Sequence, residues 1–298
     1  MKKVLVTGGS GFIGKRLKKY RPEWVYVSSK DYDLSNSEEC KKMYAHYSPD
    51  AVVHLAGCVG GIKDNTDRQA EFYYNNIMIN TNVVHQAYAA GVERVLSSLS
   101  TCCFPDKVDK YPFCEKDLFS GPPAMSNLSY AFAKRGLYVQ SKSYREQYGV
   151  NYSCFCPSNV YGPSDNFSDD SSHFVPALIK KVSNVSPAGT VELWGDGTAM
   201  RQQLYVDDLV QIIPVLLENH NTDEPLIVSP NENLTIDEMA KCLIEQVDKD
   251  IKIVYNNFLP GQHRKDGSNK ELLKKIDDFK FTPFKEGIKK TYEWYNEK

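Results

Sequence analysis

A glycine-rich segment at the N-terminus constrains the fold of this chain more than any other feature. In KKVLVTGGSGFIGKRLKKY (residues 2–20), a short apolar stretch is followed by Gly8, Gly11 and Gly14, and then by a basic helical pattern. Glycines at this spacing permit a tight turn and let backbone N–H groups approach a pyrophosphate at the start of a helix. The placement between a strand and a helix predicts a dinucleotide-binding fold, and the alternative is a glycine-rich turn that holds no ligand.

Apolar strands and helical patterns alternate through the first half of the chain. DAVVHLAG (50–57) is a continuous apolar run, as expected for a parallel strand that is buried on both faces. Further strands are expected at ERVLSSLS (93–100) and NYSCFCPSNVYG (151–162), each after a helical pattern. The alternation predicts an α/β protein with a Rossmann-like doubly wound parallel sheet over residues 1–165 and a smaller, mainly C-terminal α/β domain over residues 166–298. Some segments of the second domain are expected to return to the first.

The segment WVYVSSKDYDL (24–34) contains the strand expected to reach the adenosine ribose of the cofactor. In a protein that binds NAD, an acidic residue at the end of this strand holds the ribose hydroxyls. Here the strand ends in two serines and Lys30, whose hydroxyls and positive charge suit a 2′-phosphate and favour NADP. The nearby Asp31 argues for NAD, unless it lies around the adenine with Asp33 and Leu34.

A tyrosine and a lysine four residues apart form the candidate catalytic pair. Tyr130 and Lys134 in SYAFAKR lie on one face of the helix predicted there, so both point to the same place. An ammonium group close to a phenol lowers the pKa of the phenol, which lets the tyrosine exchange a proton near neutral pH. Alone, the pair would be interpreted as surface residues. With the N-terminal glycines and with Ser100 at the end of a predicted strand, it resembles the extended short-chain dehydrogenases/reductases, which mostly act on nucleotide sugars.

Composition excludes several other classes of protein. The 298 residues contain 36 Lys and Arg against 38 Asp and Glu, so we expect no basic surface for nucleic acid and no polybasic segment for a membrane. No apolar run approaches the ~20 residues of a membrane span, and glycines and lysines interrupt the N-terminal apolar stretch too early for a signal peptide. A cytoplasmic protein is therefore expected.

The eight cysteines do not form paired CxxC units, so no metal site is expected. Reduced thiols packed in the core explain most of them. Cys154 and Cys156 point to the same face of a predicted strand, which favours core packing. The adjacent Cys102 and Cys103, in LSTCCFP, differ because they closely follow Ser100. In a strand-like exit from Ser100, Cys102 would face the same site as the serine, and Cys103 would pack away from it.

Six segments carry a closer resemblance. They are HLAGCVGGI (54–62), LSTCCFPDK (99–107), SNLSYAFAK (126–134), PSNVYGPSDNF (157–167), SHFVPALIKK (172–181) and VELWGDGTAMRQQLYVDDL (191–209). Through them nearly the whole chain resembles the GDP-L-fucose synthase family, in its eukaryotic form. VGGI, STCxFP and DNF followed by SHFVPALI are specific to that family and are not general to the superfamily.

The resemblance implies a reaction. This is the NADPH-dependent epimerisation at carbons 3 and 5 and reduction at carbon 4 of GDP-4-keto-6-deoxy-D-mannose, which gives GDP-L-fucose. Protons next to the ketone are acidic, and epimerisation needs a base to remove each proton and an acid to return one on the opposite face. By resemblance, Cys102 is the base and His173 is the acid. Ser100, Tyr130 and Lys134 would stabilise the enolate oxygen, and the tyrosine would then protonate it during reduction.

The resemblance also implies the binding residues. For the cofactor they are Gly8, Gly9, Ser10, Gly11, Phe12, Ile13, Gly14, Lys30, Asp33, Leu34, Leu55, Ala56, Gly57, Lys134, Pro157, Asn159, Val160 and His173. For the GDP-sugar substrate, bound largely by the second domain, they are Lys181, Trp194, Arg201 and Lys265. Members of the family are typically homodimers, so a homodimer is expected that pairs through helices including the one with Tyr130.

Two alternatives stay open. One is another epimerase or reductase of NDP-4-keto-6-deoxy sugars from the same superfamily, although such an enzyme would not require both Cys102 and His173. The other is a non-catalytic regulator that senses NADP. Such regulators often lose the catalytic tyrosine or lysine, and both residues are present here.

Overall fold

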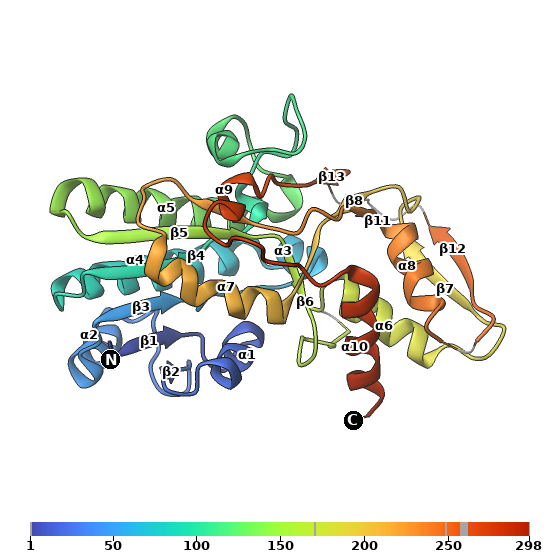
Figure 1. Ribbon diagram of the computed structural model, residues 1–298, viewed down its shortest axis with the longest axis horizontal. Helices are drawn as coiled ribbons and strands as arrows, with labels where there is room; N and C mark the ends of the chain where they lie inside the picture. The colour runs from blue at the N-terminus through green and yellow to red at the C-terminus, as the bar shows by residue number, and fades with distance from the viewer. Residues whose placement is uncertain (1, 170, 248, 257–261, 298) are drawn as a thin grey trace.

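A six-stranded parallel sheet forms the centre of the larger part of the molecule (Figure 1). The computed structural model describes residues 2–169, 171–247, 249–256 and 262–297. In spatial order the strands are β2 (Val25–Val27), β1 (Val4–Thr7), β3 (Ala51–His54), β4 (Arg94–Ser98), β5 (Asn151–Pro157) and β10 (Leu226–Val228). All neighbours run parallel, so their carboxyl ends share one edge. The strand order reverses between β1 and β3, which is where open α/β sheets bind their ligands.

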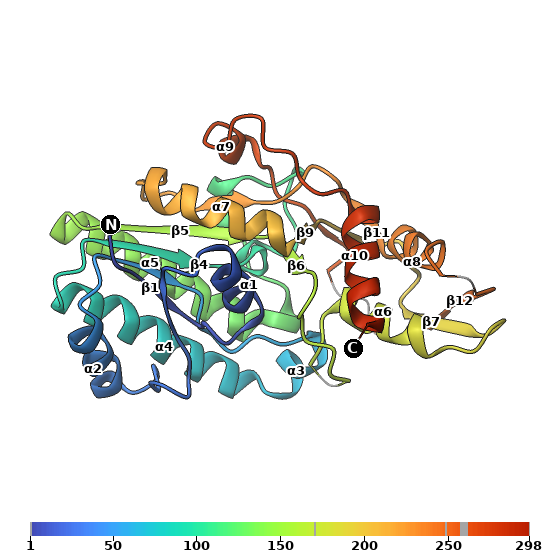
Figure 2. The ribbon, with the colours of Figure 1, turned by 60° about the horizontal axis from the view of Figure 1, so that its bottom comes forward.

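Helices cover both faces of this sheet (Figure 2). On one face lie α2 (Ser37–Tyr47), α4 (Gln69–Ala89) and α5 (Leu128–Tyr148), and on the other α1 (Phe12–Tyr20) and α7 (Val206–Asn219). Alternate strand residues supply the two cores. Leu5 and Val52 face the α4 side, whereas Val4 and Val53 face the α7 side. Both faces are buried, which explains the short apolar runs of strands such as β1 and β10. The predicted doubly wound α/β fold is confirmed.

The second half of the chain contributes to the same sheet. β10 pairs with β5, with Leu226 opposite Phe155 and Val228 opposite Pro157. α7, which precedes β10, packs its apolar side chains against the sheet face that α1 also covers. The boundary between residues 165 and 166 stays a prediction.

The smaller part of the molecule has a separate core. α6 (Phe174–Asn184), α8 (Ile236–Ile244) and α10 (Phe284–Asn296) pack against the parallel pair β7 (Thr190–Trp194) and β12 (Lys252–Asn256). Two short sheets complete it: β8 (Met200–Arg201) lies between β11 (Leu234–Thr235) and β13 (Arg264–Lys265), and β6 (Asn159–Tyr161) pairs with β9 (Gln203–Tyr205). The short elements α3 (Ile62–Asp67), α9 (Lys270–Leu273), η1 (Thr101–Cys103), η2 (Glu115–Phe119) and η3 (Met125–Asn127) lie in the connections.

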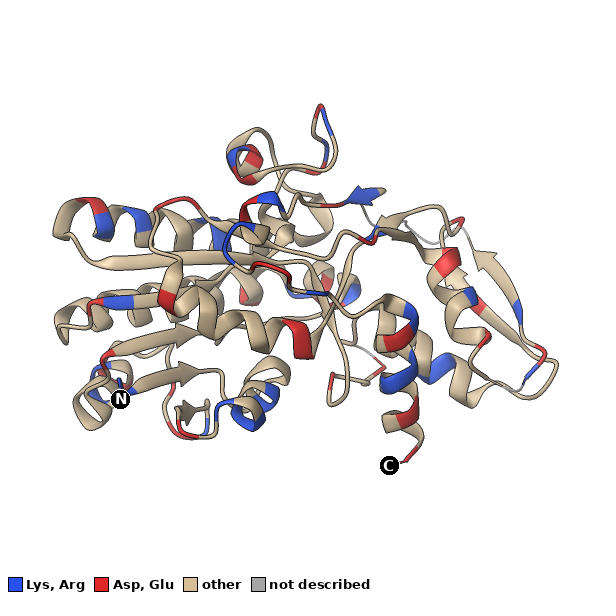
Figure 3. Cartoon of the chain, in the orientation of Figure 1, with Lys and Arg blue, Asp and Glu red and all other residues tan. Residues whose placement is uncertain are grey.

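Charges of both signs are interspersed along the described chain (Figure 3). None of the helices in the described ranges has the length and apolar character needed to cross a bilayer. All eight cysteines are free, and Cys154 and Cys156 lie in one core on the same face of β5, as predicted. In the part of the chain that the structure describes, no three His, Cys, Asp or Glu side chains are grouped to hold a metal ion.

Candidate active site

The turn after β1 forms a cradle that only glycine can line. Gly8 has a φ of +77°, and a Cβ there would lie 2.8 Å from the backbone nitrogen of Ala56. A Cβ on Gly14 would overlap the carbonyl oxygen of Gly8, which accepts a hydrogen bond from the N–H of Gly11 at 3.0 Å. α1 begins at Phe12, and no side chain caps it. Its first-turn N–H groups thus meet no competing side-chain cap, so the cradle fits the diphosphate of a dinucleotide.

The structure brings the other predicted cofactor segments to the same edge of the sheet. A Cβ on Gly57 would lie 2.9 Å from Asn76 Oδ1, so a glycine here lets the chain after β3 pass close to α4. The remaining residues of these segments are Gly9 and Ser10 in the glycine turn, Ile13 in α1, Leu55 after β3, Pro157 at the end of β5, and Asn159 and Val160 in β6.

The Gly14→Ala variant is expected to bind NADP at least about tenfold more weakly, a loss of roughly 1.4 kcal/mol or more. The new methyl group must push α1 away from the Gly8 carbonyl, which widens the diphosphate cradle. Fluorescence titration with NADPH measures the affinity. Gly149→Ala is the control, because Gly149 has a φ of +72° but nothing lies within 4 Å of its added Cβ. It should lose stability by about 1–2 kcal/mol and keep its affinity. Equal affinities in the two variants would contradict the cradle.

The loop after β2, where the adenosine ribose is expected, is held by its own side chains. The hydroxyl and backbone N–H of Ser28 donate to the Asp31 carboxylate at 2.7 and 2.8 Å, and these bonds lower the pKa of Asp31. The carboxylate of Asp31, which argued for NAD, is therefore already hydrogen-bonded within the loop. Lys30 and Asp33 are exposed, and Leu34 is buried.

Helix α5 holds the segment after β4 through two buried side chains. Lys134 Nζ donates to the carbonyl oxygen of Ser98 at 2.8 Å, and Arg135 Nε donates to the carbonyl oxygen of Cys103 at 2.7 Å. These two anchors lie on either side of residues 100–102. The helix that carries Tyr130 therefore also positions the turn that carries Cys102.

The chain leaves β4 through a 3₁₀ turn, so the predicted strand-like exit from Ser100 is wrong. Thr101–Cys103 form η1, and the Ser100 hydroxyl caps this turn by accepting a hydrogen bond from the N–H of Cys102 at 3.1 Å. A serine hydroxyl bonded to the nearby backbone competes with extended structure, and this decided the local conformation. The two thiols are nevertheless separated as expected: Cys102 is partly accessible, whereas Cys103 is buried in the core.

The Cys102 thiol is in direct contact with a lysine. Lys265 Nζ lies 2.9 Å from Cys102 Sγ. Burial acts to raise the pKa of this thiol, but the charge of Lys265 and hydrogen bonds from Lys265, Ser100 and Asn127 outweigh it, and the pKa falls below its ordinary value. Burial raises the pKa of the neighbouring Cys103 thiol to about 12. Of the adjacent pair, Cys102 is therefore the one suited to act as a thiolate base.

Tyr130 is a buried phenol that stays protonated. Burial and the charge of Cys102 raise its pKa well above the ordinary value, although a hydrogen bond with Ser100 acts in the opposite direction. The prediction that Lys134 lowers this pKa is wrong here, because the lysine Nζ lies 5.9 Å from the ring centroid and donates to a backbone carbonyl. Burial lowers the pKa of Lys134 itself to about 8. A neutral phenol beside Ser100 can donate a proton to a substrate oxygen.

His173 is the N-cap residue of α6 in the smaller part of the molecule. Solvent reaches its side chain, yet desolvation by the surrounding protein and the charge of Lys265 lower the pKa of the imidazole. The imidazole is therefore neutral in the free protein near neutral pH. Lys265 thus acts on both predicted proton-transfer groups, on Cys102 by contact and on His173 through space.

The four predicted substrate-binding residues lie in two places. Arg201 on β8 is paired in register with Lys265 on β13, and its charge interacts with Cys102. Lys181, in the last turn of α6, donates to a backbone carbonyl of β7 at 2.8 Å, and Trp194 at the end of β7 is 43% exposed. The structure therefore brings Arg201 and Lys265 to the Cys102 thiol, and Lys181 and Trp194 to the junction of α6 with β7.

Three asparagines near the site were not predicted. Asn127 hydrogen-bonds the Cys102 thiol, and its buried Oδ1 has no hydrogen-bond partner among the described residues, as expected of a group that a ligand completes. Asn76 holds the backbone after β3 through both of its amide atoms, and Asn80 pairs with a buried histidine of β3. Asn76 and Asn80 are spaced by four residues in a helix with many apolar residues, a signal that could have identified them. Asn127 lies in an irregular connection and has no such signal.

Known proteins match this chain over most of its length. Residues 4–229 match the NAD dependent epimerase/dehydratase family. The chain is 36% identical to a probable GDP-L-fucose synthase of Drosophila melanogaster, in an alignment that covers 100% of this chain and 98% of the relative. The chain belongs to the GDP-L-fucose synthase family.

Two more relatives agree with membership of the GDP-L-fucose synthase family. A GDP-L-fucose synthase of Dictyostelium discoideum is 36% identical, with 98% of this chain and 94% of the relative covered. The crystal structure of a GDP-L-fucose synthetase from Naegleria fowleri bound to NADP is 32% identical and has a TM-score of 0.90, with 99% and 93% of the two chains covered. The predicted family is confirmed, and the roles of single residues remain predictions.

Proposed function

We propose that this chain is an NADPH-dependent epimerase and reductase that converts GDP-4-keto-6-deoxy-D-mannose into GDP-L-fucose. The observation that carries the proposal is the contact of Cys102 with Lys265, in a site that also holds Ser100 and Tyr130. Proton removal next to a ketone needs a base, which this thiolate can supply, and reduction of the ketone needs a proton donor, which this phenol can supply. The GDP-L-fucose synthases among the relatives support the substrate, and the Naegleria structure supports NADP. The free cysteines support a cytoplasmic location.

Cys102 and His173 share the proton transfers of epimerisation. The Cys102 thiolate removes the proton from carbon 3 or carbon 5, where the adjacent ketone makes the C–H bond acidic. Ser100 and Tyr130 donate hydrogen bonds to the enolate oxygen that forms. His173 returns a proton on the opposite face, which requires its imidazolium form. A bound diphosphate favours that form, because its negative charge counters the effect of Lys265 on the His173 pKa.

Tyr130 completes the reduction at carbon 4. The glycine cradle after β1 and the loop after β2 would hold NADPH, which would supply the hydride. The Tyr130 phenol donates its proton to the oxygen on carbon 4. The hydrogen bond with Ser100 stabilises the phenolate that remains, and Lys134 holds the Ser98 carbonyl at the end of β4.

Arg201, Lys181 and Trp194 bind the GDP part of the substrate. The Arg201 guanidinium lies near the catalytic thiol, where it can bind the diphosphate through two parallel hydrogen bonds. Trp194 offers a flat, exposed surface at the end of β7 on which the nucleotide can stack. Lys181 adds a positive charge at the junction of α6 with β7.

The function is tested by following NADPH absorbance with purified GDP-4-keto-6-deoxy-D-mannose and identifying the product by NMR. The expected result is one NADPH consumed for each GDP-L-fucose formed. Turnover of UDP- or dTDP-linked 4-keto-6-deoxy sugars, with none of the GDP sugar, would identify another enzyme of the superfamily. NADP binding without oxidation of NADPH by any of these sugars would identify a non-catalytic regulator.

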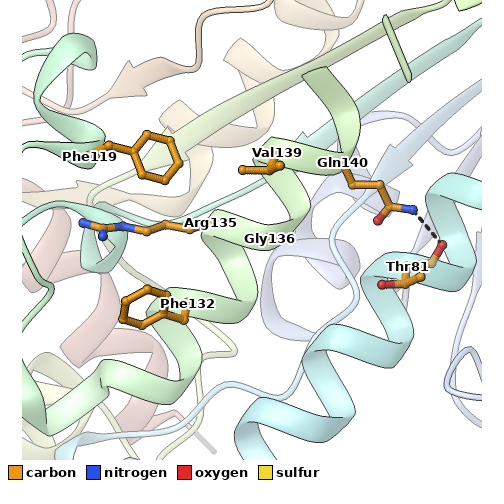
Figure 4. Close-up of a pocket in the computed structure, with 7 residues that line it drawn as sticks. All are labelled: Thr81, Phe119, Phe132, Arg135, Gly136, Val139 and Gln140. Atoms are coloured by element: carbon orange, nitrogen blue, oxygen red, sulfur yellow. Dashed lines mark hydrogen bonds between the residues drawn. The ribbon is translucent and has the colours of Figure 1, made fainter. Parts of the chain in front are cut away.

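We also propose a homodimer that pairs through α4 and α5. Figure 4 shows a surface pocket lined by Phe119, Phe132 and Val139, in which the Arg135 guanidinium lies between the two phenyl rings. These three apolar side chains are 45–55% exposed, and a hydrogen bond from Gln140 to the Thr81 backbone links α5 to α4 at the same place. Exposed apolar side chains gathered on α5 and on η2 beside it are typical of an interface. A second copy would supply the same face across a two-fold axis.

The Val139→Glu variant is expected to be a monomer. At a two-fold interface each new carboxylate is buried against an apolar partner face, which costs several kcal/mol. Light scattering coupled to size-exclusion chromatography measures the mass. Val254→Glu is the matched control, because Val254 is 41% exposed on β12 in the smaller part of the molecule, and it should remain a dimer. A dimeric Val139→Glu protein would place the interface elsewhere.

A further inference from the structure

Lys265 was expected to bind the nucleotide, but the structure places its ammonium group at the reacting thiol. The side chain is buried, with 8% of the residue exposed. Its Nζ lies 2.9 Å from Cys102 Sγ and 3.4 Å from Asn159 Oδ1. These two partners follow β4 and β5, so Lys265 reaches from the smaller part of the molecule to the carboxyl edge of the central sheet.

The acidic neighbour of Lys265 does not neutralise its charge. Successive side chains of a strand point to opposite faces. Arg264 and Asp266 lie on the same side and pair with each other through two bonds of 2.7 and 3.0 Å. Within the described ranges, Lys265 takes part in no ion pair with a carboxylate, so its charge acts on the thiol.

The backbone around Lys265 is held firmly before any substrate binds. β13 pairs with β8, with Lys265 opposite Arg201. Gly267, two residues later, donates its N–H to Gln202 Oε1 at 2.9 Å and accepts from Gln202 Nε2 at 3.1 Å. Because β13 and the residues after it are hydrogen-bonded in this way, the Lys265 side chain stays within reach of the Cys102 thiol.

We propose that Lys265 is a positioning residue for epimerisation, whose ammonium group keeps Cys102 as a thiolate and orients it in the free enzyme. The proposal rests on the proposed function only in the statement that the thiolate serves epimerisation. The contact between Lys265 and Cys102 is present in the protein without substrate. The other titratable or charged groups facing Cys102 are Arg201 on β8, Tyr130 on α5 and Cys103 in η1. Tyr130 and Cys103 are neutral because burial raises the pKa of each. Arg201 Nη1 donates to backbone carbonyl oxygens instead, so Lys265 is the cation in contact with the thiol.

The test measures the pH dependence of Cys102 alkylation by iodoacetamide without substrate, with each cysteine read separately by mass spectrometry. The wild-type Cys102 should react with a midpoint clearly below the ordinary ~8.5 of a free thiol. Lys265→Met should raise this midpoint by at least about one pH unit, the effect of losing a contacting opposite charge. Lys265→Arg should keep the midpoint near the wild-type value. Arg264→Met, on the same strand but the opposite face, should leave it unchanged.

Each outcome decides the proposal. The proposal is overturned if Cys102 of the wild-type protein is alkylated with the midpoint of a free thiol. This measurement needs no variant, so it decides the proposal even if the variants do not fold. An unchanged alkylation profile in Lys265→Met, together with a raised KM, would assign Lys265 to the substrate diphosphate and would also overturn it. The proposal is supported if Lys265→Met exchanges deuterium at carbons 3 and 5 more slowly than the wild type at neutral pH, recovers at higher pH and keeps the wild-type KM. If the protein converts no GDP sugar, the proposed function fails while the alkylation result still decides the role of Lys265.

Discussion

The Cys102→Ser variant is expected to lose epimerisation by about 10²–10⁴-fold, the range for removal of a general base. A hydroxyl is far less acidic than a thiol, so the ammonium of Lys265 cannot hold it as an anion near neutral pH. NMR of deuterium wash-in at carbons 3 and 5 measures the effect directly. Reduction of the unepimerised ketone should persist, because Ser100 and Tyr130 are unchanged. The expected product therefore keeps the original configuration at carbons 3 and 5.

Cys103→Ala is the matched control for this variant. Cys103 is adjacent in the chain but fully buried in the core, and burial raises the pKa of its thiol to about 12. Its replacement should lower the free energy of unfolding by about 1 kcal/mol and leave deuterium wash-in unchanged. If Cys102→Ser exchanged deuterium at the wild-type rate, the assignment of the base would be wrong.

Tyr130→Phe is expected to lose reduction by about 10²–10⁴-fold. The phenol is the proton donor for the oxygen on carbon 4, and burial keeps it protonated by raising its pKa. Phenylalanine fills the same volume on α5, so the variant should fold and bind NADP. Single-turnover measurement of NADPH oxidation gives the rate. Deuterium wash-in should fall less, because Ser100 can still donate a hydrogen bond to the enolate oxygen.

Tyr148→Phe, at the end of the same helix, is the control for Tyr130→Phe. Tyr148 is 44% exposed and stacks on Tyr88, away from the thiol and the lysine of the site. Its loss of a hydroxyl should leave NADPH oxidation at the wild-type rate. Equal losses in the two tyrosine variants would indicate a general effect on α5 and would remove Tyr130 from its proposed role.

Some features of the site were predictable because neighbouring residues of the chain define them. Gly8, Gly11 and Gly14 lie close together in residues 8–14, and their spacing is enough to predict the cradle that the structure shows. Tyr130 and Lys134 are one helical turn apart, so the helix alone places them on one face. Buried parallel strands appear as apolar runs for the same local reason, since both of their faces are covered.

Two other expectations were wrong because the packing around a residue outweighed the pattern of its neighbours in the sequence. The strand-like exit after β4 did not form, because the Ser100 hydroxyl caps a 3₁₀ turn and Arg135 anchors the carbonyl of Cys103. The pKa of Tyr130 is raised rather than lowered, because burial exceeds any effect of Lys134. Neither the extent of burial nor the place of an anchoring side chain can be calculated from spacing along the chain.

The amino-acid sequence alone determined the cofactor cradle, the tyrosine–lysine pair and the α/β fold, since each depends on contacts within one or two turns or on the burial of a single strand. Tertiary structure alone decided which cation meets the Cys102 thiol. Cys102 and Lys265 are 163 residues apart, and they meet because β13 pairs with β8 and points one buried lysine toward the edge of the central sheet. The charge that sets the pKa of a thiol acts over a few ångströms in space, whatever the distance along the chain.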